Sequence, residues 1–330
     1  MSSAATQLRH PVAEVLRARS VRGSLPEARD EPHRLALVLE GGGMRGVVSA
    51  GMTAALERLG LTQCFDLVVG ASAGAINGAA LIAGVAQHGA ATYSGPLASR
   101  SFVNPAHLLR GRPVIDVDHV LDLAGGLAET GHERVIASHI ALHCIAVDVE
   151  SAAVVDLSGM RSKRALWGAL LASSRMPWAG GAPVEVDGRR YLDGGMASPI
   201  PVAEAIAAGA THVLALQTRP HGVPRKSASR IADRMIERHL RRLNPALVRL
   251  YRDRVARYEV LVDDIARRSL DPGADGPPYV LGVRPPAGTP CVGQLERRST
   301  VLAAAATQAE RLVEHALSAG TWPRPAPSRT

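Results

Sequence analysis

The stretches that decide the fold are residues 35–46, LALVLEGGGMRG, and residues 65–74, FDLVVGASAG. Each begins with a continuous apolar run, LALVL and FDLVV, which is typical of a strand covered on both faces. Each run ends in a glycine-rich turn, and helical patterns follow at residues 47–59 and 74–85. Strand, helix, strand and helix with short joints predict right-handed crossovers, and therefore a parallel sheet.

The rest of the chain adds further elements of both kinds. Strands are predicted at residues 140–149, 152–157, 184–186, 191–192, 212–217 and 279–283, and helices at residues 161–173, 200–208 and 292–317. Apolar residues recur at helical spacing in residues 231–243 and 247–265, on either side of Asn244-Pro245, which predicts two amphipathic helices. A looser helical region at residues 105–131 is predicted to cover the mouth of an active site.

The composition is that of a globular protein. The 330 residues are 46% hydrophobic and 21% charged, with three scattered cysteines, too few for a disulfide framework or a four-cysteine zinc site. A reducing, cytoplasmic location is therefore expected. Residues 67–86 alone are apolar enough for a membrane span, but they contain Ser72, Asn77 and four glycines. We predict that they form a buried strand and a buried helix.

The first motif lies between a predicted strand and a predicted helix and consists of Gly41, Gly42, Gly43, Met44, Arg45 and Gly46. It fits the G-x-G-x-x-G pattern of dinucleotide-binding loops, and Asp66 follows Gly46 by twenty residues. An acid that binds a ribose should lie at the C-terminal end of the second strand, whereas Asp66 lies at its start. The motif itself supplies backbone N–H groups at a helix N-terminus, which can bind either a phosphate or a developing oxyanion.

The second motif is Gly70-Ala71-Ser72-Ala73-Gly74, a G-x-S-x-G sequence at another strand-to-helix joint. A nucleophile elbow needs a tight, strained turn that exposes the serine hydroxyl, and it needs small neighbours. All four neighbours of this serine are small. The alternative is that the serine is only the N-cap of the following helix.

The third motif is Asp193-Gly194-Gly195, which follows the second strand of a predicted hairpin. Asp-Gly is a common turn dipeptide, so this motif by itself indicates only a turn. In combination the three motifs indicate more, because turns that follow parallel neighbouring strands leave the same edge of the sheet. A glycine loop would then lie beside an exposed serine, which is the arrangement that acyl transfer requires.

In this order, the three motifs resemble those of the patatin-like phospholipases: a glycine-rich loop with an arginine, then G-x-S-x-G, then D-G-G. The match continues at residues 172–177, ASSRMP, and covers residues 35–218. The resemblance implies an α/β fold of three layers, with a central, mostly parallel sheet flanked by helices. It also implies a lipolytic acyl-ester hydrolase of the phospholipase A or lysophospholipase type, acting on an acyl ester or a phospholipid. No cofactor or metal is expected, because the sequence contains no cluster with convincing ligand spacing.

The resemblance implies a Ser-Asp dyad, with Ser72 as the nucleophile and Asp193 as the proton acceptor. The N–H groups of Gly42, Gly43 and Met44 would hold the oxyanion. Arg45 would steady the loop or attract an anionic head group, or else simply pair with a nearby acid. A carboxylate with a pKa of about 3.9 is a poor base for a serine hydroxyl. Asp193 must therefore be desolvated and lie at hydrogen-bond distance.

Four regions are expected along the chain. Residues 1–34 are a polar lead-in, and residues 35–218 are the catalytic core. Residues 219–318 would complete the same domain with a basic helical pair, a closing strand and a C-terminal helix. Residues 319–330 are a flexible, proline-rich tail.

Other functions remain open at this point. A Ser-His-Asp esterase would also carry G-x-S-x-G, with its histidine after the acid. Histidines follow Asp193 at four positions, none with a local signature: His212, His221, His239 and His315. An acyltransferase would use the same motifs with an acceptor other than water. A non-catalytic nucleotide-binding module would leave Ser72 and Asp193 without a role.

The positive charge is concentrated in one segment. Residues 225–270 hold 13 basic and 6 acidic residues, which accounts for +7 of the net charge of +8. No nucleic-acid-binding motif accompanies this charge, so a nucleic-acid partner is not expected. Two interpretations remain: the basic helices rest on an anionic membrane, or their apolar stripes pack on the domain and the arginines are a solvated face. The sequence fixes neither the acyl donor nor the oligomeric state.

Overall fold

The computed structural model describes residues 10–100, 102, 104, 114, 115, 127–177, 180–225 and 229–318. The predicted helical region at residues 105–131 therefore lies mostly outside the described residues. The same is true of the first nine residues of the lead-in and of the tail from residue 319 onward.

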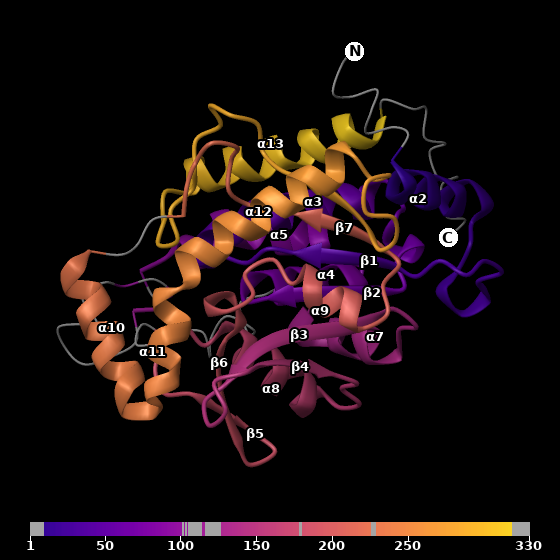
Figure 1. Ribbon diagram of the computed structural model, residues 1–330. Coiled ribbons are helices and arrows are strands. Elements are labelled where there is room, and N and C mark those ends of the chain that lie inside the picture. The colour runs from indigo at the N-terminus through magenta and orange to yellow at the C-terminus, as the bar shows by residue number, and fades with distance from the viewer. Residues whose placement is uncertain are drawn as a thin grey trace.

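Strands in the described part of the chain form one mixed sheet of eight strands (Figure 1). They are β1 (Leu35–Leu39), β2 (Leu67–Ala71), β3 (Ala141–Asp148), β4 (Val154–Ser158), β5 (Val184–Val186), β6 (Arg189–Asp193), β7 (His212–Leu216) and β8 (Tyr279–Val283). The order is β5-β6-β3-β2-β1-β7-β8, and β4 also pairs with β3. The strands from β3 through β2, β1 and β7 to β8 are parallel, whereas β4, β5 and β6 pair antiparallel. The predicted mostly parallel sheet is confirmed.

The principal helices of the described residues are α2 (Pro11–Arg22), α3 (Val47–Arg58), α4 (Ala73–Ile82), α5 (Ala86–Ser94), α7 (His132–Ala137), α8 (Lys163–Ser174), α9 (Val202–Ala207), α10 (Arg230–Leu243), α11 (Pro245–Arg252), α12 (Arg254–Leu270) and α13 (Ser299–Ser318). They cover both faces of the sheet. Leu35, Leu37 and Leu39 of β1 belong to a core with α3, α4, α5, α8 and α13. Ala36 and Val38 point the other way, toward α9 and α12, because side chains alternate along a strand. The three-layer architecture is confirmed.

The apolar segment from residue 67 to residue 86 forms β2 and α4, as predicted. Among the described residues, no helix is both long enough and apolar enough to cross a membrane.

The prediction of two helices between residues 231 and 265 is wrong, because the second of them is divided. α11 ends at Arg252 and α12 begins at Arg254. Asp253 between them keeps right-handed helical dihedral angles, φ −77° and ψ −5°. The apolar spacing therefore continues across the break, and the pattern alone could not reveal it.

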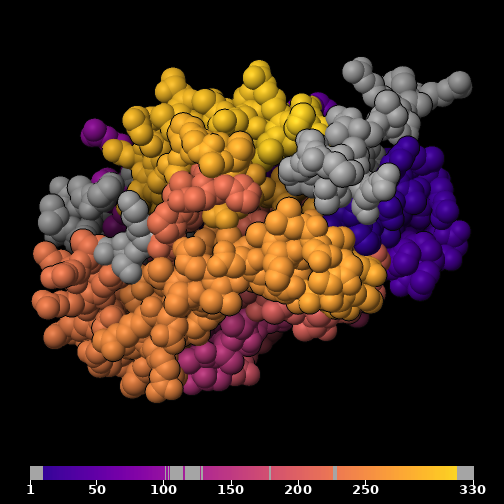
Figure 2. Space-filling model, turned by 45° about the horizontal axis from the view of Figure 1, so that its top comes forward, coloured from indigo at the N-terminus to yellow at the C-terminus, as the bar shows by residue number. Residues whose placement is uncertain are grey.

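The C-terminal helix begins later than predicted. α13 begins at Ser299 and packs against α3, whereas the prediction began the helix at residue 292. Residues 292–298 instead pass over the glycine-rich loop, where the carbonyl of Gln294 accepts a hydrogen bond from the N–H of Met44 at 3.0 Å. Figure 2 shows α13 together with α10, α11 and α12 on one face of the molecule.

The lead-in contains a helix that the sequence analysis did not predict. α2 buries Val12, Val15 and Leu16. The buried guanidinium of Arg19 forms ion pairs with Glu31 at 2.6 Å and with Asp66 at 2.7 Å. These long-range ion pairs attach α2 to the start of β2, and no local pattern in a short, polar segment indicates them.

Candidate active site

The three motifs meet at one edge of the sheet. The glycine-rich loop follows β1 and Ser72 follows β2, and these strands are parallel neighbours, with Leu39 opposite Gly70. The loop and the serine are in direct contact, since a Cβ atom on Gly41 would lie 2.9 Å from the Cβ of Ser72. Asp193 ends β6, which pairs with β3, the other neighbour of β2. The predicted geometry of the two turns is therefore confirmed.

Ser72 occupies a strained turn. Its dihedral angles are φ 57° and ψ −132°, a region that costs roughly 1–3 kcal/mol for a residue other than glycine. Gly74 permits this turn, because a Cβ atom there would lie 2.3 Å from the carbonyl oxygen of Leu39. Ser72 directly precedes α4, but its side chain makes no capping hydrogen bond. The alternative that Ser72 is only an N-cap is therefore not supported.

The Ser72 side chain lies close enough to the carboxylate of Asp193 to lower the pKa of that carboxyl. The same carboxylate accepts the N–H of Gly195 at 2.7 Å. Asp193 is 6% exposed, and burial raises its pKa from 3.8 to about 6, against the opposing effects of Ser72, Gly195 and the cation of Arg225. A dry carboxylate paired with the serine is the environment that a base at this position requires.

The C-terminal end of α8 and the residue that follows it bind the backbone N–H groups of both Ser72 and Asp193. The N–H of Ser72 donates to the carbonyl of Ser173 at 3.1 Å and to its hydroxyl oxygen at 3.0 Å. The Ser173 hydroxyl in turn donates to the carbonyl of Ile145 in β3 at 2.6 Å. Two residues further on, the carbonyl of Arg175 accepts the N–H of Asp193 at 2.9 Å. In the sequence, residues 172–177 are marked only by the family resemblance, because hydrogen bonds between distant segments leave no spacing pattern.

The backbone of the glycine-rich loop differs in one respect from the prediction. The N–H groups of Gly42 and Gly43 have no acceptor among the described residues. The N–H of Met44, which was predicted to hold the oxyanion, instead donates to the carbonyl of Gln294. The reason is the path of residues 292–298 over the loop. Of the three predicted donors, Gly42 and Gly43 are therefore the two available in this structure.

Arg45 lies near an acid, Glu40, which agrees with one of the roles predicted for it. Its side chain is buried, with Nε donating to the hydroxyl of Thr218 at 3.1 Å and Nη2 lying 3.8 Å from Glu40. It also supports the loop, since a Cβ atom on Gly42 would lie 2.6 Å from its Nη2. A buried and paired guanidinium cannot attract a lipid head group at the surface.

Arg225 is a cation near the base that sequence reasoning missed. Its Nη2 donates to the carbonyl of Gly195 at 3.1 Å, and its guanidinium lies 5.6 Å from the centre of the Tyr258 ring. Burial lowers the pKa of Arg225 to about 10, but the side chain remains charged at neutral pH. It therefore favours the ionised form of Asp193 and braces the Asp-Gly-Gly turn.

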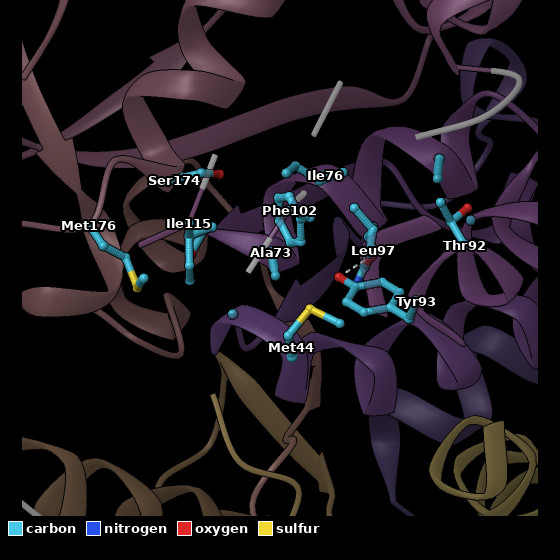
Figure 3. Close-up of a pocket in the computed structure, with 15 residues that line it drawn as sticks. Met44, Ala73, Ile76, Thr92, Tyr93, Leu97, Phe102, Ile115, Ser174 and Met176 are labelled. Carbon is cyan, nitrogen blue, oxygen red and sulfur yellow. Dashed lines mark hydrogen bonds between the residues drawn. The ribbon is translucent and has the colours of Figure 1, made fainter. Parts of the chain in front are cut away.

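An apolar pocket begins at Ser72 and contains about 680 Å³ of empty space, including its open mouth (Figure 3). Its walls come from the glycine-rich loop, α4, α5 and the segment after α8, together with two residues of the sparsely described region. The lining residues are Gly43, Met44, Ser72, Ala73, Ile76, Asn77, Ala80, Gly89, Thr92, Tyr93, Leu97, Phe102, Ile115, Ser174 and Met176.

The structure bears on the competing functions. Asp66, the candidate ribose ligand, is bound to Arg19 and Arg29 and accepts the N–H of Leu35, at the opposite end of β2 from the glycine-rich loop. The groups that act on the Asp193 carboxylate include no histidine. Within the described ranges, no three or more His, Cys, Asp and Glu side chains are grouped so that they could hold a metal ion.

Residues 37–206 of the chain match the patatin-like phospholipase family. The match covers more than half of the 330 residues, and the chain therefore belongs to this family. The resemblance drawn from the three motifs is confirmed.

The chain is similar to two further proteins, one in sequence and one in structure. The uncharacterized protein YjjU of Escherichia coli strain K12 is 31% identical over 193 residues, which cover 58% of this chain and 53% of YjjU. The match thus spans about half the length of that curated relative. The crystal structure of VipD from Legionella pneumophila aligns with a TM-score of 0.41 and 12% identity, covering 88% of this chain and 67% of the VipD chain.

Proposed function

We propose that this protein is a lipolytic acyl-ester hydrolase in which Ser72 is the nucleophile and Asp193 is its base. The observation that carries the proposal is the position of the strained Ser72, which lines an apolar pocket and lies next to the buried carboxylate of Asp193. Membership of the patatin-like phospholipase family supports lipolytic acyl hydrolysis in general. The dyad is the more specific part of the proposal.

The reaction begins with attack of the Ser72 oxygen on the ester carbonyl carbon, while the hydroxyl proton passes to Asp193. A base acts best when its pKa is near the working pH. The pKa of about 6 therefore makes Asp193 a better proton acceptor than an ordinary aspartate, while it is still ionised at neutral pH. The N–H groups of Gly42 and Gly43 stabilise the oxyanion of the tetrahedral intermediate, because they have no competing acceptor among the described residues.

Collapse of the intermediate breaks the bond to the alcohol, which leaves with the proton held by Asp193. Ser72 then carries the acyl group as an ester. Asp193, ionised again, takes a proton from a water molecule that attacks this ester, and the acid is released. Transfer to an acceptor other than water uses the same two residues, so only identification of the product distinguishes hydrolysis from acyl transfer.

Residues 35–318 form one catalytic domain in this proposal. Two contacts of the C-terminal third support that division: β8 extends the sheet beside β7, and α13 packs on α3. The predicted boundaries at residues 34, 218 and 318 remain predictions.

The outer face of α10 is suited to an anionic membrane, which would bring the lipid substrate to the enzyme. Ile231 is 72% exposed and Met235 is 42% exposed. Both acids of the helix are engaged internally: Asp233 pairs with Arg254 and Glu237 with Arg252. This leaves a face that is basic and apolar. Its exposed arginines are Arg230, Arg234, Arg238, Arg241 and Arg242.

The other interpretation of the basic segment holds for α11 and α12. Leu247 and Val248 of α11 are buried in a core cluster. Tyr258, Val262 and Ile265 of α12 pack against the sheet. We therefore restrict the membrane proposal to α10, which forms an outer corner of the molecule in Figures 1 and 2.

A fluorophosphonate probe tests the dyad directly, since it forms a covalent bond with an activated serine. We expect the probe to label Ser72, identified by mass spectrometry of the digested protein, and to leave Ser72→Ala unlabelled. Ser72→Ala should also lose ester hydrolysis while keeping the circular dichroism spectrum of the wild type. Ser158→Ala, at the exposed end of β4, is the matched control and should remain active. Substantial turnover by purified Ser72→Ala would contradict the proposal and favour another site.

A further inference from the structure

The pocket at Ser72 has a defined direction. On α4 its wall is formed by Ala73, Ile76, Asn77 and Ala80, which lie on one face of that helix. On α5 the opposing wall is formed by Gly89, Thr92 and Tyr93. Figure 3 shows Ala73, Leu97, Tyr93 and Thr92 in succession across the view, with Met176 and Ser174 at the other side. The pocket therefore runs from the serine along the groove between α4 and α5.

The polar side chains that α4 and α5 contribute to this wall already have hydrogen-bond partners within the protein. Asn77 donates to the carbonyl of Gly46 and to the hydroxyl of Ser49, and its own oxygen accepts the hydroxyl of Tyr93 at 3.2 Å. Thr92 donates to the carbonyl of His88 within its own helix at 2.9 Å. A ligand in the groove thus meets mainly carbon. This favours an alkyl chain over a sugar or a peptide, whose polar groups would lose their hydrogen bonds there.

The length of the groove follows from the geometry of α4. Eight residues separate Ser72 from Ala80, which corresponds to about 12 Å at a rise of about 1.5 Å per residue. An extended alkyl chain advances about 1.3 Å per carbon, given carbon–carbon single bonds of about 1.5 Å. About nine carbons therefore reach from the serine to Ala80.

The groove narrows at Ala80, which is the position that an extended chain of about nine carbons reaches. A Cβ atom on Gly89 of α5 would lie 3.4 Å from the Cβ of Ala80, which is close to van der Waals contact. The two helices therefore meet here, and only the small size of these two residues leaves room between them. A larger side chain at either position would occupy the far end of the groove.

We infer that the groove between α4 and α5 binds the straight acyl chain of the substrate, and that Ala80 and Gly89 set the longest chain that it holds extended. The preferred substrates are esters of medium-chain acids, with about eight to ten carbons. This inference rests on the proposed function for its catalytic consequence, but the binding of the chain does not depend on a reactive serine.

Equilibrium binding of straight-chain fatty acids to Ser72→Ala tests the inference without catalysis. Displacement of a fluorescent fatty acid measures the affinity for a series from four to fourteen carbons, each kept below its micelle concentration. We expect the affinity to rise about fourfold for each methylene buried. It should level off at about ten carbons.

Ala80→Leu in the same background should move the plateau to about seven carbons. It should weaken binding of the ten-carbon acid by roughly 60-fold, since three methylenes are displaced at about fourfold each. Gly89→Leu approaches the same space from the other helix and should have the same effect, so the inference can be tested even if one variant does not fold. Ala91→Leu, at an exposed position of α5, is the control and should keep the original plateau.

A plateau at the same length in both groove variants and in the control would overturn the inference, as would an affinity independent of chain length. The hydrolysis of p-nitrophenyl esters by proteins that retain Ser72 separates this failure from that of the proposed function. Hydrolysis with no preference for chain length overturns the groove and leaves the hydrolase intact. Length-dependent binding by a wild type that hydrolyses no ester supports the groove and overturns the dyad.

Discussion

Replacing Asp193 with asparagine should abolish ester hydrolysis and, at the same time, stabilise the fold above neutral pH. The cause of the stabilisation is burial, which raises the pKa of Asp193 from 3.8 to about 6. Ionising this carboxyl is therefore less favourable in the folded chain than in the unfolded chain. The group contributes stability that is fully present below pH 3.8 and is lost as the pH rises through about 6.

The size of the effect follows from the two pKa values. The difference between 3.8 and about 6 corresponds to about 3 kcal/mol at pH 8, at about 1.4 kcal/mol per pKa unit. This net difference already includes the effects of Ser72, Gly195 and Arg225 on the charged carboxylate, and asparagine resembles the neutral carboxyl in size and in its capacity to accept the N–H of Gly195. The variant should therefore be about 3 kcal/mol more stable at pH 8. For a chain of this length that is an increase of about 4 °C in Tm.

Denaturant unfolding of the wild type and of Asp193→Asn at pH 8, 6 and 4 measures this difference. We expect the advantage of the variant to be largest at pH 8, to be only slightly smaller at pH 6 and to fall steeply toward pH 4, as the pH approaches the value of 3.8 at which the carboxyl of the unfolded chain titrates. Asp263→Asn removes the same charge from an exposed position of α12 and should change the stability by less than about 0.5 kcal/mol. A variant no more stable than the wild type at pH 8, or an advantage that does not depend on pH, would refute the reasoning.

Four further outcomes are expected. In the wild type, kcat/KM should fall tenfold per pH unit below about pH 6, because the base must be ionised to accept the proton of Ser72; a profile flat to pH 4.5 would exclude Asp193 as that base. Each histidine that follows Asp193 should be replaceable by alanine with a loss of activity of less than about tenfold, or roughly 1.4 kcal/mol of barrier; loss of all turnover in a folded variant would restore the Ser-His-Asp alternative. Activity should survive treatment with a chelator, and a loss that calcium reverses would contradict this expectation. Finally, a fourfold Arg-to-Gln variant of α10 should bind anionic vesicles less tightly at low salt, while it hydrolyses a soluble ester at the wild-type rate. A charge-matched control variant distant from α10 should bind the vesicles as the wild type does. Equal vesicle binding by both variants would reject the membrane contact. The α10 variant changes Arg234, Arg238, Arg241 and Arg242, and the control changes Arg17, Arg22, Arg161 and Arg311.

Much of the fold could be predicted because its central strands are determined locally. β1 and β8 begin and end at the predicted residues. Each is a short, mainly apolar run, which is the pattern typical of a strand covered on both faces, and the sequence alone shows where such a run starts and stops. The adjacency of the glycine-rich loop and Ser72 followed from the parallel pairing of β1 and β2. These features depend on short segments, and their consequences follow from general rules of chain topology.

The features that could not be predicted depend on contacts between distant segments. Arg19 is buried in a polar lead-in because Glu31 and Asp66 pair with it. The Met44 N–H is engaged because Gln294, far along the chain, passes over the loop. Ser173 binds both the N–H of Ser72 and the carbonyl of Ile145, yet only the family resemblance of residues 172–177 indicated it in the sequence. Sequence reasoning found the reactive groups, therefore, but not the groups that hold them in place.

The arrangement around Ser72 also explains why such a site requires a rigid sheet. A positive φ at Ser72, a buried carboxylate and two N–H groups without acceptors among the described residues are each unfavourable. The loop and Ser72 follow the fully buried strands β1 and β2, and Ser173 ties Ser72 to β3, so the surrounding sheet holds them in place. The strain is thus offset by burial elsewhere in the same sheet. On this reasoning, substitutions that relieve it will stabilise the fold and remove the chemistry together, as Asp193→Asn is expected to do.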